Sequence, residues 1–195
     1  MTLLAARGVS HSFGTHVALQ QAELALSAGE VVALLAPNGA GKSTLLSILA
    51  GALAPTSGVV ERHARVGWVP QRPAHYAKLT ARENLRLFAS LEGVPRTRAD
   101  ELAGEFGLPA GVRAGALSVG NRQRLDVALA LVPSPQVLLL DEPTASLDPE
   151  QRARVWAIAA RLREQGGAVL VATHHWEELE GRVDRTLHLD EGRLA

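Results

Sequence analysis

One stretch, residues 30–50, constrains what this chain can fold into more than any other. Glu30–Leu35 is apolar after its first residue, which is typical of a strand buried on both faces of a sheet. A loop with two glycines follows at 36–41, and Ser43–Ala50 then carries leucine and isoleucine at helical spacing. An apolar strand that runs through such a loop into a helix predicts an α/β fold with a mainly parallel sheet.

The loop is suited to hold phosphate groups. In the pattern G-x-x-x-x-G-K-[ST], backbone N–H groups and the helix N-terminus converge on a phosphate, the lysine reaches its outer oxygens, and the hydroxyl ligates Mg²⁺. Gly39, Gly41, Lys42 and Ser43 fit, whereas Ala36 replaces the first glycine and strains the turn if that position needs a positive φ. A plain glycine-rich turn is the alternative, but Lys42 is one of only two lysines in the chain, which favours the phosphate loop.

Length and composition limit the other classes of protein. With 195 residues, the chain can form one sizeable core and a small lobe. Its 20 basic and 20 acidic side chains cancel, so we expect no nucleic acid as a partner. The absence of cysteine excludes disulfides and thiolate metal sites. The sequence shows neither a signal peptide nor an apolar run near the roughly 20 residues that span a bilayer, so we expect a soluble protein.

The segment before the phosphate loop predicts antiparallel strands. Leu3–Val9 and Ala18–Leu26 read as two short strands around a turn that contains Phe13. Phe13 is either a core residue at a strand end or a ring on which a purine stacks.

Two apolar segments after the phosphate loop end near polar side chains. The stretches 59–60 and 66–69 predict a short hairpin, and Gln71 follows at its end. A later apolar strand ends on Asp141 and Glu142, at the sheet edge where ligands of α/β folds bind. Asp141 therefore has the context of a carboxylate that reaches Mg²⁺ directly or through water, and Glu142 is the candidate general base.

Between these segments the pattern changes to helix. A capping box begins at Thr80, 99–106 predicts a second, weaker helix, and Ser118 is a good N-cap for a third. We therefore expect a single domain, residues 1–195, with a helical subdomain inserted at about 78–132.

The C-terminal third continues the alternation of strands and helices. Asp148 caps a helix that begins at Pro149, and a buried strand at 168–173 ends next to His174. A final pair of strands flanks the turn at 190–192.

Six motifs in this order resemble the nucleotide-binding domains of ABC-type ATPases. They are the phosphate loop, Gln71, the stretch Leu117-Ser118-x-Gly120-x-x-Gln123-Arg124, Asp141-Glu142-Pro143-Thr144, Ser146-Leu147-Asp148, and Thr173-His174. The resemblance covers nearly the whole chain.

The resemblance implies ATP and Mg²⁺ as cofactors and assigns a role to each matching residue. Phe13 resembles the adenine-stacking aromatic residue, Gln71 the ligand that senses Mg²⁺ and the attacking water, and Glu142 the base. His174 resembles the switch histidine at the γ-phosphate, whereas we expect His175 to be a bystander and the other histidines to be surface or structural residues. Metal contacts are expected from Ser43, Gln71 and Asp141. Nucleotide contacts are expected from Phe13, Asn38, Gly39, Ala40, Gly41, Lys42, Ser43, Thr44, Ser118, Gly120 and Asp148.

The resemblance also implies a second cassette, in a homodimer or a heterodimer. In this family the signature serine and glycine, here Ser118 and Gly120, complete the site of another subunit, and Asp148 resembles a dimer-contacting aspartate. Val119 and Asn121 depart from the usual glycine and glutamine. Asn121 shortens the side chain that could close a capping box back to Ser118. These departures raise the hypothesis of a slow ATPase, but the intact catalytic set favours an active one.

The function implied is the ATP-hydrolysing subunit of an ABC transporter, bound to a membrane-spanning permease subunit on the cytoplasmic face of the cell membrane. The helix start at Thr80 resembles export-type cassettes for drugs, lipids or polysaccharides. Two alternatives remain open: a soluble ABC ATPase acting on DNA or ribosomes, and a catalytically weak ATP-binding regulatory module. Phosphate release separates the regulatory module from the transporter subunit.

Overall fold

Two β-sheets form the framework of the structure, a computed structural model that describes residues 1–144 and 147–195 apart from the side chain of residue 178. The smaller sheet is antiparallel, with order β2-β1-β4, and the larger one has order β5-β6-β7-β3-β8-β9. In the larger sheet all neighbours are parallel except β8 and β9. The strands are β1 (Thr2–Phe13), β2 (His16–Ser27), β3 (Val31–Leu35), β4 (Ser57–Arg62), β5 (Val66–Val69), β6 (Val137–Asp141), β7 (Ala168–Thr173), β8 (Arg185–Asp190) and β9 (Arg193–Leu194).

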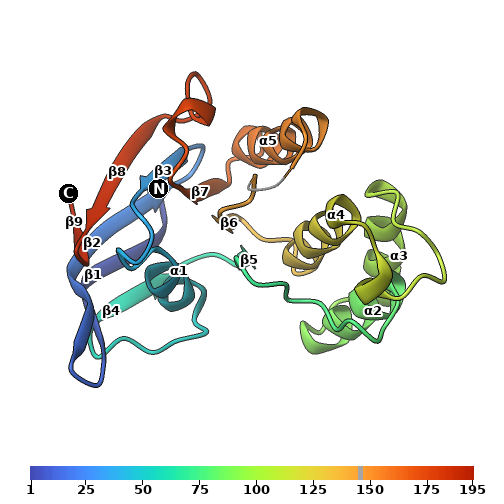
Figure 1. Ribbon diagram of the computed structural model, residues 1–195, viewed down its shortest axis with the longest axis horizontal. Coiled ribbons are helices and arrows are strands. Elements are labelled where there is room, and N and C mark those ends of the chain that lie inside the picture. The colour runs from blue at the N-terminus through green and yellow to red at the C-terminus, as the bar shows by residue number, and fades with distance from the viewer. Residues whose placement is uncertain (145–146) are drawn as a thin grey trace.

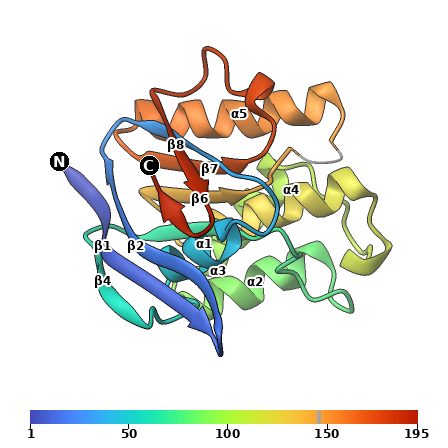
Figure 2. The ribbon, with the colours of Figure 1, turned by 60° about the vertical axis from the view of Figure 1, so that its left-hand side comes forward.

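The helices divide between the two faces of the larger sheet. Buried leucines of α1 share one core with β1, β2 and the parallel strands, so α1 fills the space between the sheets (Figure 2). The opposite face packs against α4 and α5, and α2 and α3 extend this second core into a helical lobe (Figure 1). The helices are α1 (Lys42–Ala50), α2 (Ala81–Leu91), α3 (Arg96–Glu105), α4 (Val119–Ala130) and α5 (Pro149–Glu164), with 3₁₀ turns at Ala114–Ala116 and Trp176–Glu178. The predicted α/β fold is therefore confirmed.

Helix starts follow the local capping signals. Thr80 accepts a hydrogen bond from the Glu83 N–H at 3.2 Å, and the Glu83 carboxylate accepts one from the Thr80 N–H at 2.8 Å, which completes the predicted capping box. Ser118 and Asp148 cap α4 and α5 as predicted. These signals lie within four residues of each helix start, which is why the sequence alone reveals them.

The predicted hairpin of residues 59–60 with 66–69 is wrong. Its two strands lie in different sheets: β4 pairs with β1 and β5 pairs in parallel with β6. The chain passes from one sheet to the other within three residues. The His63 N–H still donates to Leu3 O at 2.9 Å, whereas Arg65 O already accepts from the Gln136 N–H at 3.0 Å. Gly67 of β5 packs so closely against Ala130 of α4 that a side chain there would clash. A local sequence pattern contains neither the pairing with β6 nor this packing on α4, so it could not predict them.

The topology brings the chemically important strand ends together. Leu35 of β3 lies opposite Thr173 of β7, and Asp141 of β6 lies opposite Ala172. The loops after β3, β6 and β7 therefore leave the same edge of the sheet, as expected for parallel strands. Within the described ranges, none of the helices is both long and apolar enough to cross a membrane.

Candidate functional site

The loop between β3 and α1 depends on its glycines. Gly39 and Gly41 have φ values of 84° and 106°, which side chains rarely adopt. A Cβ on Gly41 would also lie 2.5 Å from Ala18 O, so the loop can approach β2 only with glycine there. Ala36 is not among the described non-glycine residues with positive φ, so the strain expected at this position is absent. The first position of the loop therefore accommodates alanine.

The Lys42 ammonium lies at the centre of the loop. The side chain is 7% exposed, and Nζ donates to Ala36 O at 2.7 Å and to Pro37 O at 3.1 Å. It also lies 3.5 Å from Oε1 of Glu142, which follows β6, two strands away from β3 in the sheet. A cation held by weakly basic carbonyl oxygens can exchange them for phosphate oxygens, with which its hydrogen bonds are stronger.

Glu142 connects three side chains at the sheet edge. Its Oε1 lies 2.9 Å from His174 Nδ1, and its Oε2 accepts a hydrogen bond from Thr173 Oγ1 at 3.2 Å. The backbone of Glu142 has a φ of 50°, an uncommon value for a residue with a side chain. Thr173 belongs to the motif with His174, but the sequence assigned it no role of its own, since that role follows only from this contact. The His175 ring stacks against His174 with centroids 3.8 Å apart and does not need a separate role.

Asp141 is a buried carboxylate that makes no hydrogen bond of standard geometry among the described residues, although Ser43 and the Gln71 backbone lie close to it. Burial raises its pKa, and the charge of Glu142 adds to that rise, while Ser43, Lys42 and the Gln71 backbone act in the opposite direction. A buried unpaired carboxylate is costly unless a cation balances it. Carboxylate and hydroxyl oxygens suit Mg²⁺, so Asp141 and Ser43 fit that ion. The described residues contain no group of three or more His, Cys, Asp or Glu that could hold a metal, so further ligands would come from phosphate and water.

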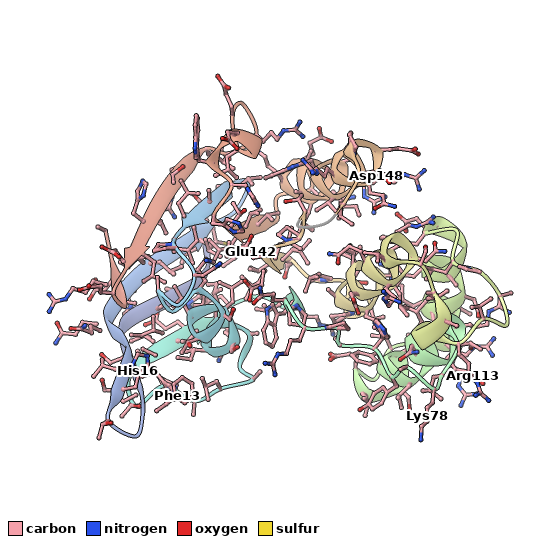
Figure 3. The ribbon with its side chains drawn as sticks, viewed as in Figure 1. Phe13, His16, Lys78, Arg113, Glu142 and Asp148 are labelled. Atoms are coloured by element: carbon pink, nitrogen blue, oxygen red, sulfur yellow. The ribbon has the colours of Figure 1, made fainter. Side chains whose placement is uncertain are left out.

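Lys42, Ser43 and Glu142 line a cleft of about 370 Å³, whose lining within the described residues does not include Asp141, Thr173 or His174. Phe13 stands at its mouth, 54% exposed, with its ring edge-on to His11 at 4.5 Å between centroids. His16, expected to be a surface or structural residue, also lines the cleft beside Phe13 (Figure 3). Ala40 is buried at 7% exposure and lies in the loop behind the cleft wall. The lining residues are Phe13, His16, Ala18, Asn38, Gly39, Gly41, Lys42, Ser43, Thr44, Gln71 and Glu142.

The remaining predicted nucleotide contacts lie outside this cleft. Among the described residues its lining does not include Ser118, Gly120 or Asp148, and Figure 3 shows Asp148 at the start of α5, apart from Phe13. Ser118 Oγ accepts from the Asn121 N–H at 3.3 Å, and Asp148 accepts from the Gln151 N–H at 2.8 Å. Ser146, part of the motif with Asp148, lies outside the described residues.

The signature stretch at the start of α4 is locally ordered despite its two departures. The Asn121 side chain accepts a hydrogen bond from Arg124 rather than closing a capping box with Ser118. Val119 is 53% exposed, so its side chain does not fill the core. Gly120 packs against the end of the Gln151 side chain, which would have to move if Gly120 carried a side chain.

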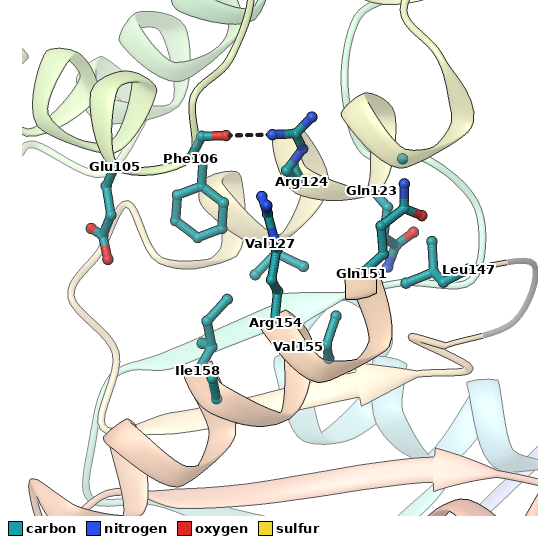
Figure 4. A pocket seen from close by; sticks show the side chains of 12 residues that line it. Glu105, Phe106, Gln123, Arg124, Val127, Leu147, Gln151, Arg154, Val155 and Ile158 are labelled. Atoms are coloured by element: carbon teal, nitrogen blue, oxygen red, sulfur yellow. Dashed lines mark hydrogen bonds between the residues drawn. The ribbon is translucent and has the colours of Figure 1, made fainter. Parts of the chain in front are cut away.

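A second cavity, of about 210 Å³, lies between α4, α5 and the end of α3 (Figure 4). Apolar side chains such as Phe106, Val127 and Ile158 form much of its wall, and Arg124 donates to Phe106 O at 3.2 Å. None of its lining residues belongs to the loop between β3 and α1. We therefore do not assign phosphate chemistry to it.

Comparisons with known proteins identify the family. A family model described as "ABC transporter" matches residues 19–145. The Nod factor export ATP-binding protein I of Burkholderia lata is 38% identical over an alignment of 205 positions. The alignment covers 96% of this chain and 67% of the relative. The lipoprotein-releasing system ATP-binding protein of Gluconobacter oxydans is 41% identical over 202 residues, covering 91% of this chain and 87% of the relative.

Solved structures share the fold. An ATP-binding subunit of an ABC transporter superposes with a TM-score of 0.88 at 26% identity, covering 98% of this chain and 88% of the other. A dimeric ATP-binding cassette in a post-hydrolysis state, bound to ADP and Pi, superposes with a TM-score of 0.87 at 27% identity, covering 98% and 96%.

Proposed function

The chain belongs to the ABC transporter family, and on that premise we propose that it hydrolyses ATP to energise export through a separate membrane subunit. The observation that carries the proposal is the convergence of Lys42, Ser43, Gln71 and Glu142 on one cleft, with the buried Asp141 close to these residues. This set supplies phosphate binding, metal binding and a base at one place.

Each group has one proposed role in hydrolysis. Lys42 exchanges the Ala36 and Pro37 carbonyls for phosphate oxygens of ATP, and Ser43 and Asp141 hold Mg²⁺, which would neutralise phosphate charge. Glu142 accepts a proton from the attacking water. Its carboxylate is held on one side by Thr173 and on the other by His174, so its orientation is set before substrate binds.

Gln71 and Phe13 are proposed to contact the two ends of the nucleotide. Gln71 follows β5 and lines the cleft near Asp141, which places it to orient water or a metal-bound ligand. Phe13 offers an exposed ring face at the mouth, where an adenine can stack.

The cleft of one chain does not include Ser118 and Gly120, the signature residues that in this family complete the site of another subunit. We therefore propose a head-to-tail pair of cassettes. The capped N-terminus of α4, with Ser118 and Gly120, presents N–H groups and a positive dipole end suited to a phosphate of the partner's ATP. Asp148 would contact the partner near the same position. The dimeric cassette bound to ADP and Pi supports this arrangement.

The membrane partner and the direction of transport are proposed from the relatives. Their names describe Nod factor export and lipoprotein release, which support export. We accordingly place the chain on the cytoplasmic face of the membrane, as one domain spanning residues 1–195 with its helical insert at about 78–132. The alternative of an ATPase acting on DNA or ribosomes has no support among these relatives.

The test is steady-state phosphate release with Mg²⁺ and ATP. Lys42→Ala should weaken ATP binding about 10- to 150-fold, because a charge-assisted contact contributes about 1.5–3 kcal/mol. Lys78→Ala is the matched control, since Lys78 is the other lysine and projects from the helical lobe (Figure 3). Unchanged turnover in Lys42→Ala would refute the phosphate-loop assignment, and an inactive wild-type protein that still binds ATP would favour the regulatory module.

A further inference from the structure

A buried contact between a histidine and an aspartate joins the segment after Gln71 to the signature helix. His75 Nδ1 lies 2.7 Å from Asp126 Oδ1, and the two side chains are 4% and 7% exposed. The backbone N–H groups of Ala74 and His75 face the same carboxylate. One acidic side chain of α4 thus gathers three donors from a loop that begins in the nucleotide cleft.

The pair is more than a surface contact. Burial raises the pKa of Asp126, while the His75 ring and the two N–H groups act in the opposite direction. A buried carboxylate is retained in a fold only when its partners compensate for lost hydration. Removing the His75 ring therefore leaves Asp126 with only the two backbone N–H groups and weakens the attachment of the loop to α4.

Other contacts attach the rest of this loop to the helical lobe. Asn84 of α2 is fully buried, accepts from the Tyr76 N–H at 2.7 Å and donates to Tyr76 O at 3.1 Å. The N–H of Gly115, three residues before Ser118, donates to Ala77 O at 2.9 Å. Residues 75–77 are thereby held by the lobe, whereas Gln71 lines the cleft. The Asp126–His75 pair is the contact nearest to Gln71 in this series.

We propose that Asp126 and His75 are positioning residues that couple Gln71 in the chain's own cleft to Ser118, the residue that completes the partner's site. Asp126 lies eight residues beyond Ser118 on α4, a distance of about 12 Å along a rigid helix. A shift of Ser118 on binding the partner's nucleotide is therefore passed to the loop behind Gln71. The coupling rests on the proposed function, since it requires two cassettes that share their nucleotides.

Two neutral amide variants separate geometry from charge. In His75→Asn the amide nitrogen falls near the position of Nδ1 and keeps the bond to Asp126, whereas in His75→Gln it falls near Nε2 and loses it. His75→Gln should lower kcat about 2- to 30-fold, the range for coupling through indirect contacts, with an unchanged Kd for ATP measured on the monomer. His75→Asn should restore most of the turnover. If His75→Gln does not fold, Asp126→Asn, which removes the charge at constant size, replaces it in the same assay.

A double-mutant cycle distinguishes coupling from simple support of the lobe. In a Gln71→Ala background, His75→Gln should have little further effect on kcat, because the residue it positions is gone. Arg86→Leu is the control, since it breaks an exposed pair with Asp100 in the same lobe and should leave kcat unchanged. Equal turnover of His75→Gln and wild type, or the same factor lost in both backgrounds, would overturn the proposal. Absence of turnover in the wild-type protein would instead overturn the proposed function. Failure of the coupling and failure of the proposed function are therefore distinguishable.

Discussion

Replacing Glu142 by glutamine separates catalysis from nucleotide binding. The carboxylate contacts Thr173 at 3.2 Å, His174 at 2.9 Å and Lys42 at 3.5 Å. Glutamine keeps the size and an acceptor oxygen, so the contact with Thr173 can persist. Lys42 also retains two carbonyl partners, so its ammonium is not left unpaired. We expect a stability change of no more than about 1 kcal/mol, well below the roughly 3–5 kcal/mol for breaking an isolated buried ion pair.

Turnover should fall much further than stability. A positioned general base contributes about 10²–10⁴-fold, which corresponds to about 3–5 kcal/mol of transition-state stabilisation. ATP binding should survive, because the phosphate contacts of Lys42 and the proposed metal contacts of Asp141 are unchanged. Unhydrolysed ATP then stabilises the two-cassette state by linkage, since a ligand stabilises the state to which it binds best.

The assay pairs phosphate release with light scattering of Glu142→Gln at low salt, with and without ATP. We expect slow release and a dimer only with ATP. Ser118→Arg in the same background should remain monomeric, because arginine removes the cap of α4 and adds bulk at the dimer contact. Hydrolysis near the wild-type rate would remove Glu142 from the role of base. A monomer in both conditions, despite measured ATP binding, would contradict the proposed pairing of cassettes in the isolated chain.

Three further substitutions test individual positions. Val119→Gly should keep or raise kcat, because it removes an exposed side chain beside the proposed partner nucleotide; loss of turnover would show that the signature has adapted to valine. Gly41→Ala should destabilise the fold in urea by about 1–3 kcal/mol and abolish ATP binding, because its Cβ would lie 2.5 Å from Ala18 O at a φ of 106°. Asp141→Asn should abolish turnover yet stabilise the protein by about 1–3 kcal/mol in metal-free buffer at neutral pH. Burial raises the pKa of Asp141, so its ionised form disfavours folding at neutral pH, and the gain in Tm should vanish as the pH falls below the ordinary carboxyl pKa; an unchanged Tm at neutral pH contradicts this reasoning.

The sequence alone was sufficient wherever the signal is local. The caps at Thr80, Ser118 and Asp148 place three helix starts correctly, because a side chain there bonds a backbone N–H three residues on. The phosphate loop and the apolar strands before Asp141 and His174 likewise predicted the α/β fold and one edge of the sheet as the site. The order of the motifs added the family, which the comparisons confirm.

Only the tertiary structure decided which segments meet. Residues 59–60 and 66–69 are close in sequence, yet the second strand pairs in the other sheet, where Gly67 packs on α4. The backbone at Ala36, the place of His16 in the cleft and the bond from Thr173 to Glu142 depend on neighbours far away in the chain. The Asp126–His75 pair spans 51 residues and carries no local pattern. A helix cap or an apolar run is encoded by adjacent residues, whereas these long-range contacts are fixed by the packing of whole helices and strands. The sequence therefore determined the helices, the strands and the chemistry of their ends, and the tertiary structure determined which of them contact one another.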